Sequence, residues 1–121
     1  MEARLNYYGN SVTAKFAKYI NSAGAVVSAS TLPAATQELV KIRASQINGC
    51  AYCTDMHTKD AAHAGESQQR LNLVAAWREA KVFTEAERAA LVSSIAGINA
   101  YNRINVITRQ PAGSYQPGQW G

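Results

Sequence analysis

Residues 38–57 organise this sequence and read ELVKIRASQINGCAYCTDMH. The first part of this stretch favours a helix with an apolar face that includes Leu39 and Ile42. Asn48-Gly49 then gives a strong turn signal, because both residues tolerate a positive φ and glycine does so without steric cost. A second helical segment follows, so we predict two helices that fold back on each other about this turn.

Immediately after the turn comes a C-x-x-C dithiol formed by Cys50 and Cys53. We expect a helix from about Cys50 to Ala64 that stops at Gly65, where a left-handed cap is expected. Cysteines three residues apart on one helix face lie close enough to form a disulfide. Unpaired amides and the positive end of the helix dipole favour thiolate, the reactive form, at this position.

Two further side chains fit proton chemistry at these thiols. His57 lies four residues after Cys53, so both should share one helix face, and the imidazole could accept the Cys53 proton. Folding about Asn48-Gly49 places Glu38 and His57 at roughly similar heights, about 16 and 12 Å from the turn. We therefore expect a contact between Glu38 and His57, direct or through water, that orients the ring and raises its basicity.

The residues alone leave other interpretations of the dithiol open. A single C-x-x-C with one histidine also fits a zinc site or two ordinary buried thiols. Zinc needs a fourth ligand, and His63 would supply it only if the helix after Cys53 bent back. In a reducing compartment, reactivity or metal binding is favoured over a structural disulfide.

Helical patterns also flank this region. The first predicted helix has Ser11 as its N-cap, and the next begins near Pro33 and runs to about Gln46. A further helix spans about Gln68 to Lys81, and a capping box of Thr84 and Glu87 starts a last one that reaches about Ile107. The buried stripe of the first helix is expected to comprise Val12, Phe16, Tyr19, Ile20, Ala23 and Val27.

The C-terminal segment differs in composition from the rest. Pro111, Gly113 and Pro117 favour an extended arm over a packed element. We therefore divide the chain into one all-α domain, residues 1–110, and a C-terminal arm, residues 111–121.

Composition narrows the class of protein. A chain of 121 residues with 47% hydrophobic and 17% charged residues fits one folded domain. The net charge of +4 comes from singly spread Lys and Arg, which argues against a nucleic-acid partner. Neither an apolar run after Met1 nor a stretch long enough to span a bilayer occurs, so we expect a cytoplasmic protein without membrane contact.

The motif around the cysteines resembles the core of AhpD-like alkylhydroperoxidases in the carboxymuconolactone decarboxylase superfamily. The likeness covers residues 38–57 continuously and continues in residues 65–66, 70–71, 77–79 and 87–91, so it spans roughly residues 30–110. It implies an all-α helical bundle with the C-x-x-C at the N-terminus of a central helix. It also implies assembly as trimers or hexamers.

The resemblance further implies a peroxiredoxin-like antioxidant activity, in which hydroperoxides are reduced through a Cys50–Cys53 disulfide cycle. Cys53 matches the peroxide-reactive thiol, Cys50 matches its disulfide partner, and His57 and Glu38 match the proton relay. No metal or other cofactor is implied, because an external thiol or dithiol donates the electrons. The lactone decarboxylase branch lacks the dithiol, so both cysteines argue against that activity.

The sequence departs from this pattern in two places. AhpD has a second histidine immediately before its second cysteine, where this chain has Tyr52. Relatives carry a further helical stretch between the segments matching Leu91 and Ile98, which nearly abut here, so either one or two helices are lost or a disordered piece is missing from this sequence. A metal-binding or regulatory module that uses the same Cys and His residues, and lactone chemistry in an inherited pocket, stay open as alternatives.

Overall fold

The computed structural model describes residues 2–77, 79–85 and 91–119, and every regular element in these residues is helical. The all-α prediction is therefore confirmed. The elements are a 3-10 turn Tyr7–Gly9 (η1), α1 (Ser11–Ser28), α2 (Ala34–Ile47), α3 (Ala51–His63), α4 (Gln68–Leu73), a 3-10 turn Val74–Ala76 (η2) and α6 (Leu91–Thr108). None of these helices is long and apolar enough to cross a membrane.

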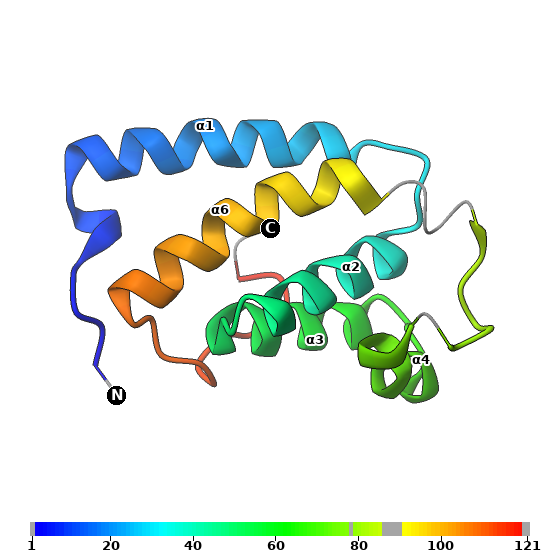
Figure 1. Cartoon of the computed structure of the whole chain (residues 1–121). Helices are drawn as coiled ribbons and strands as arrows, with labels where there is room; N and C mark the ends of the chain where they lie inside the picture. Colours follow the sequence, from blue (N-terminus) through cyan, green and yellow to red (C-terminus); the bar gives the residue numbers. More distant parts are fainter. Residues whose placement is uncertain (1, 78, 86–90, 120–121) are drawn as a thin grey trace.

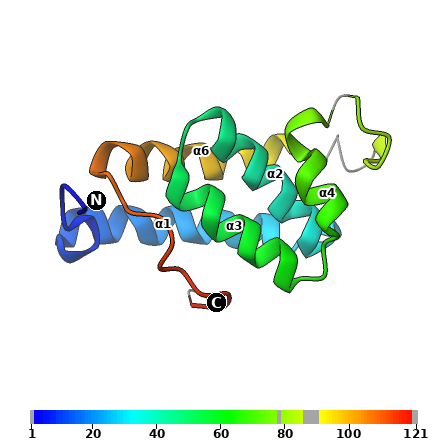
Figure 2. The ribbon, with the colours of Figure 1, turned by 90° about the horizontal axis from the view of Figure 1, so that it is seen from below.

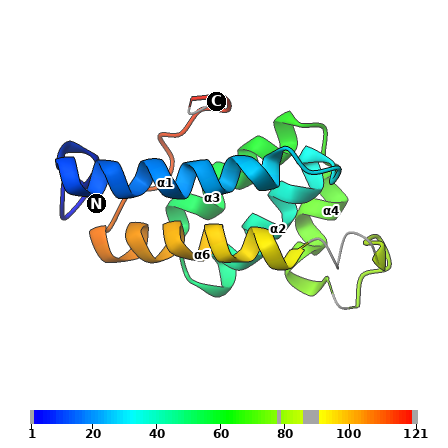
Figure 3. The same cartoon turned by 90° about the horizontal axis from the view of Figure 1, so that it is seen from above.

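The helices form two packed layers. α2 and α3 form an antiparallel hairpin, and α6 packs on this hairpin, mainly on α2 (Figure 1). α1 lies beside α6 on the side away from the hairpin and runs in the opposite direction (Figures 1 and 3). The two cysteines at the start of α3 therefore lie on the side of the hairpin that packs against α6.

The turn between α2 and α3 has the predicted form, with one difference. Gly49 adopts φ +68°, whereas Asn48 stays at φ −82°. The Asn48 side chain instead donates to Asn99 Oδ1 at 2.6 Å and to Asn102 Oδ1 at 3.0 Å, both on α6. The turn thus reverses the chain at Gly49 and joins the hairpin to α6 through Asn48.

Helix caps agree with the sequence at α3 and differ at α1. Cys50 is the N-cap of α3, and Gly65 follows the helix with φ +92°, as predicted. The N-cap of α1 is Asn10 and not Ser11, because the Asn10 side-chain oxygen accepts from the amides of Val12 and Thr13. The side-chain oxygen of Asn10 thus accepts from two backbone N–H groups, and the helix begins at the next residue, Ser11.

The predicted buried stripe of α1 is only partly correct. Val12, Phe16 and Tyr19 are 74%, 54% and 63% exposed, and Ala17 is the buried residue of this helix. Of the other predicted residues, Ile20 and Val27 are half-buried and Ala23 is exposed. The exposed Val12, Phe16 and Tyr19 have no covering element within the described residues.

The helix predicted from Gln68 to Lys81 is shorter than expected. α4 ends at Leu73, and a 3-10 turn follows it. Arg70 Nη1 donates to the Val82 carbonyl at 2.5 Å, and its guanidinium lies 4.9 Å from the centre of the Phe83 ring. Because Phe83 packs against the core, the chain turns back toward α4 instead of continuing as a helix.

The predicted last helix agrees with the structure at its C-terminal end. Glu87, the second residue of the predicted capping box, lies outside the described residues, whereas α6 ends at Thr108, close to the predicted Ile107. The division into a domain and an arm stays a prediction. The expectation that the arm does not pack is wrong, because it folds back along α3 and buries Tyr115 (Figure 2).

Two apolar clusters form the core. The first contains the buried Leu39, Ile42, Ala61 and Val74, which confirms the predicted inward face of α2. The second contains Ala44, Cys50, Cys53 and Ile98, with Tyr52 and Tyr101 packed against it. Both thiols therefore belong to the core itself.

Candidate active site

The local fold at the start of α3 holds the two sulfurs together. Cys50 is the N-cap residue, and its Sγ accepts a hydrogen bond from the Cys53 amide at 3.4 Å. Both cysteines are free thiols, and they are 3% and 0% exposed. The predicted pair thus lies in a site from which bulk water is excluded.

The two thiols differ in acidity. A hydrogen bond from the Cys53 thiol, together with backbone donors at the helix start, lowers the pKa of Cys50 to about 7. The pKa of Cys53 is raised, because Cys53 donates that hydrogen bond, is buried, and lies beside the Cys50 charge. The reduced pair therefore carries its negative charge on Cys50, with one proton held between the two sulfurs.

This order of acidity, in which Cys50 is the more acidic thiol, differs from the sequence-based expectation that His57 directly activates Cys53. The structure records no hydrogen bond between His57 and either sulfur within the described part of the chain. The Nε2 atom of His57 is buried and has no hydrogen-bond partner there. The Cys53 thiol and the helix-terminus donors therefore lower the pKa of Cys50 without a hydrogen bond from the imidazole.

Glu38 and His57 make the direct contact that the hairpin geometry predicted. His57 Nδ1 donates to Glu38 Oε2 at 2.6 Å, and Lys41 Nζ binds the other oxygen at 2.6 Å. Burial raises the pKa of Glu38, but the hydrogen bonds and charges of His57 and Lys41 outweigh it, so the net shift is downward. Glu38 is therefore an ionised partner that fixes the orientation of the imidazole.

Sequence reasoning missed two residues of α6 that face the thiols. Asn105 Nδ2 donates to Cys53 Sγ at 3.1 Å, and Asn105 is buried. Asn102 is fully buried, and its hydrogen bonding favours the thiolate form of both cysteines. Asn102 also binds Ser45 Oγ at 3.0 Å. The three-residue spacing of Asn99, Asn102 and Asn105 was the available signal, because it places amides on one helix face.

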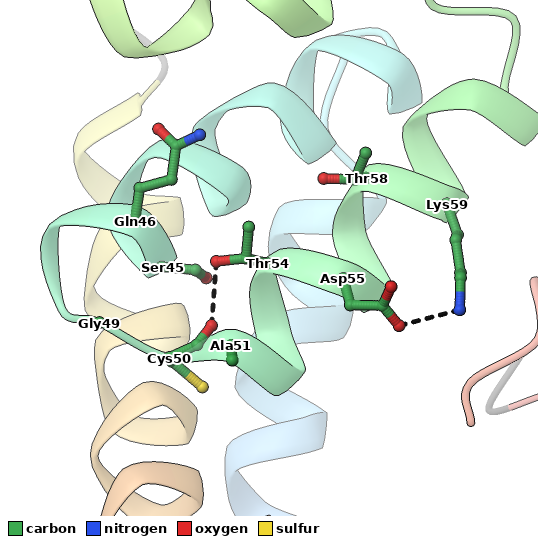
Figure 4. Close-up of a pocket in the computed structure, with 9 residues that line it drawn as sticks. All are labelled: Ser45, Gln46, Gly49, Cys50, Ala51, Thr54, Asp55, Thr58 and Lys59. Atoms are coloured by element: carbon green, nitrogen blue, oxygen red, sulfur yellow. Dashed lines mark hydrogen bonds and ion pairs between the residues drawn. The ribbon is translucent and has the colours of Figure 1, made fainter. Parts of the chain in front are cut away.

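An open groove of about 620 Å³ lies on the outer side of the α2–α3 hairpin. It is lined by Ser45, Gln46, Gly49, Cys50, Ala51, Thr54, Asp55, Thr58 and Lys59. Figure 4 shows that the Cys50 sulfur points away from Ser45 and Thr54 on this side. Cys50 therefore borders the groove, whereas Cys53 is not among the residues that line it.

Asp60 joins Glu38 and His57 on the other side of α3. One polar atom from each of the three lies within 4.8 Å of the others. His57 and Lys41 already occupy the Glu38 oxygens, and Tyr115 holds Asp60. These contacts hold the Glu38 and Asp60 carboxylates in hydrogen bonds, so the three residues form an acid–base cluster. The predicted zinc alternative gains no support, since His63 lies exposed at the end of α3.

The comparisons with known proteins agree with this arrangement. The model of the carboxymuconolactone decarboxylase family matches residues 14–92. The uncharacterized protein YdfG of Bacillus subtilis (strain 168) is 40% identical over 96 residues. This match covers 75% of the present chain and only 60% of YdfG.

A solved structure is similar over nearly the whole chain. It is the crystal structure of an Agrobacterium tumefaciens protein of unknown function, proposed to be the antioxidant defence protein AhpD. The TM-score is 0.80 at 30% sequence identity, and the match covers 94% of this chain and 100% of that chain.

Proposed function

We propose a function from one premise: this chain belongs to the carboxymuconolactone decarboxylase family, as an AhpD-like member. We infer that it is a thiol-dependent peroxidase that reduces hydroperoxides and takes part in antioxidant defence. The observation that carries the proposal is the buried Cys50–Cys53 pair, with a lowered pKa at Cys50, one helical turn before the His57 that contacts Glu38. Reactive thiols need that combination of thiolate and nearby proton carrier.

In the oxidative half of the cycle, Cys53 attacks the hydroperoxide. The proton shared by the two sulfurs moves to Cys50, so Cys53 becomes the thiolate, and Asn105 donates to its sulfur. The sulfur attacks the terminal peroxide oxygen, the O–O bond breaks, and Cys53 becomes a sulfenic acid. The family resemblance supports Cys53 as the attacking thiol. The position of His57, one helical turn after Cys53 in α3, supports the same choice.

The alkoxide that leaves takes a proton, and the Glu38–His57 pair supplies it. The Nδ1 side of the imidazole is held by Glu38, which leaves the buried Nε2 as the atom that exchanges the proton. Cys50 then attacks the Cys53 sulfenic sulfur. A disulfide forms, and the hydroxyl departs with the Cys50 proton as water. The sum is one hydroperoxide and two thiols converted to alcohol, water and one disulfide.

In the reductive half, an external thiol or dithiol restores the pair. Its thiolate attacks the disulfide at Cys50, which is the less buried of the two cysteines and borders the groove, and Cys53 leaves. A second thiol of the donor then releases Cys50. We therefore propose a hydroperoxide substrate and a thiol donor as the two small-molecule partners.

The test follows thiol content in the reduced protein after one equivalent of several hydroperoxides. We expect both thiols to disappear per hydroperoxide consumed, with a Cys50–Cys53 disulfide in the peptide map. The Cys50→Ser/Cys53→Ser double variant should consume none. Metal analysis of the purified protein addresses the metal-binding alternative.

Two results would contradict the proposal. The first is hydroperoxide consumption that persists in the double variant, which would point to thiol-free chemistry. The second is stoichiometric metal together with thiols that no hydroperoxide oxidises.

A further inference from the structure

We propose that the C-terminal arm completes the acid–base part of the active site, with Asp60 and Tyr115 as positioning residues for the Glu38–His57 pair. The inference rests on the proposed function for its role in peroxide reduction, but its geometry stands independently. It goes beyond the dithiol and the relay, because it gives the last residues of the chain a part in setting the proton on His57.

The first step is the contact between the arm and α3. The Tyr115 hydroxyl donates to Asp60 Oδ1 at 2.8 Å and lies 3.0 Å from Oδ2. Asp60 in turn lies within 4.8 Å of the polar atoms of Glu38 and His57. Tyr115 is only 4% exposed, although it lies in a segment rich in proline and glycine. The burial of a tyrosine in such a segment indicates that its ring occupies one specific position.

The second step is that several bonds fix the arm where it meets α3. Lys59 Nζ donates to the Gly113 carbonyl at 3.2 Å and to the Tyr115 carbonyl at 3.1 Å. The same ammonium binds Asp55 at 2.9 Å, and Asp55 accepts from the Gly113 amide at 3.1 Å. Gly113 has φ +104°, which a side chain would oppose. Charge-assisted hydrogen bonds, and not packing alone, therefore fix the position of Tyr115.

The third step concerns charge around His57. Glu38 binds Nδ1 of the imidazole, and a carboxylate oxygen of Asp60 lies within 4.8 Å, so two carboxylates face His57. Lys41 of α2 neutralises part of the Glu38 charge, and Tyr115 donates to Asp60. Of the other packed helices, α4 carries Arg70, which pairs with Glu66, and α6 carries the exposed Arg103.

Tyr115 is a permanent donor in this arrangement. Burial and the hydrogen bond to Asp60 raise the pKa of Tyr115 to about 12, so the phenol keeps its proton at neutral pH. Its O–H therefore always withdraws charge from Asp60. Tyr115 therefore weakens the field of Asp60 at His57, so the two side chains act on the imidazole in opposite directions.

These opposite roles give opposite predictions. Asp60→Asn removes a negative charge, so His57 should lose its proton at a lower pH, by about one pH unit. Tyr115→Phe keeps the ring but removes the donor, so Asp60 acts more strongly and His57 should lose its proton at a higher pH. In the double variant the Tyr115→Phe effect should vanish, because Tyr115 acts only through Asp60.

The experiment is a pH titration of the imidazole NMR signals in the reduced full-length protein. The chain has two histidines, and His63→Gln assigns the signals of His57. Gln116→Ala, an exposed residue of the same arm, is the matched control and should leave the titration unchanged. The pH dependence of the single-turnover thiol oxidation rate should move with the NMR midpoint in each variant.

The possible outcomes separate the inference from the proposed function. Unchanged NMR titrations in Asp60→Asn and Tyr115→Phe would overturn the inference, as would a Tyr115→Phe shift that persists in the double variant. The NMR shifts together with a wild-type protein that no hydroperoxide oxidises would support the arm's electrostatic role and overturn the proposed peroxidase function.

Discussion

At the level of single residues, the hydrogen bonds to the two sulfurs come from α3 and from α6. Cys50 takes donors from the start of α3 and from Asn102, whereas Cys53 takes them from Asn105 and Asn102. Hairpin geometry was enough to predict the Glu38–His57 contact, because both residues lie at similar distances from one turn. The acidity order of the thiols was not predictable, since it depends on which sulfur donates the hydrogen bond between them and on burial.

Asn105 should stabilise the Cys53 thiolate. In a Cys50→Ser background, where a single thiol titrates, Asn105→Ala should raise the pKa of Cys53. A hydrogen bond to a charged group is worth about 1.5–3 kcal/mol, which corresponds to about one to two pH units. Thiolate absorbance measured against pH reports this shift. The control Asn99→Ala alters the same face of α6 but not the bond to sulfur, and an equal shift there would contradict the assignment.

Glu38 and His57 should act as one unit. Glu38→Gln and His57→Gln are each expected to slow thiol oxidation by about 100-fold, the lower end of the range for general acid–base catalysis. Since the imidazole needs the carboxylate for its orientation, the double variant should be about as slow as the slower single variant. Stopped-flow rates test this. A double variant that loses the product of both factors would show independent roles.

At the level of helices and turns, the sequence located most elements and missed several boundaries. α2, the Gly49 turn and the start of α3 were predictable, because apolar spacing, turn chemistry and caps agree there. The cap at Asn10 was missed because Ser11 has similar capping chemistry. α4 was predicted too long, because the turn back toward it depends on contacts of Arg70 with Val82 and Phe83.

Replacement of Gly49, in the turn of the hairpin, should destabilise the fold. A side chain at φ +68° costs roughly 1–2 kcal/mol in backbone conformation, and an added Cβ would meet nothing within 4 Å. Gly49→Ala should therefore lower the free energy of unfolding by that amount in a urea titration. Gly24→Ala lies within α1 in open space and should instead raise it by about 0.5–1 kcal/mol. Changes of the same sign would contradict this account.

For the molecule as a whole, periodicity identified an amphipathic first helix but not the element that covers it. The exposed Val12, Phe16 and Tyr19 on α1 form an apolar face without a partner in the described part of the chain. A contiguous face of this kind marks an interaction site. We therefore propose that the chain self-associates through α1, as the resemblance to trimeric and hexameric proteins implies.

Light scattering at micromolar concentration should give a mass that is a multiple of the 13.0 kDa chain. Phe16→Lys should shift the population toward the monomer, because it places a charge in the centre of the face. Lys15→Ala, at the neighbouring exposed position, should leave the mass unchanged. A wild-type protein that is monomeric at every concentration would contradict self-association through the α1 face.

The disulfide cycle assigns different steps to its two sulfurs, and single-turnover stopped flow combined with mass spectrometry tests this most directly. Cys50→Ser should still undergo one fast oxidation by hydroperoxide and stop as a sulfenic acid on Cys53. Cys53→Ser should react barely faster than a free thiol. The reverse pattern, with fast oxidation retained only in Cys53→Ser, would show that the low pKa of Cys50 selects the attacking sulfur and would contradict the assignment.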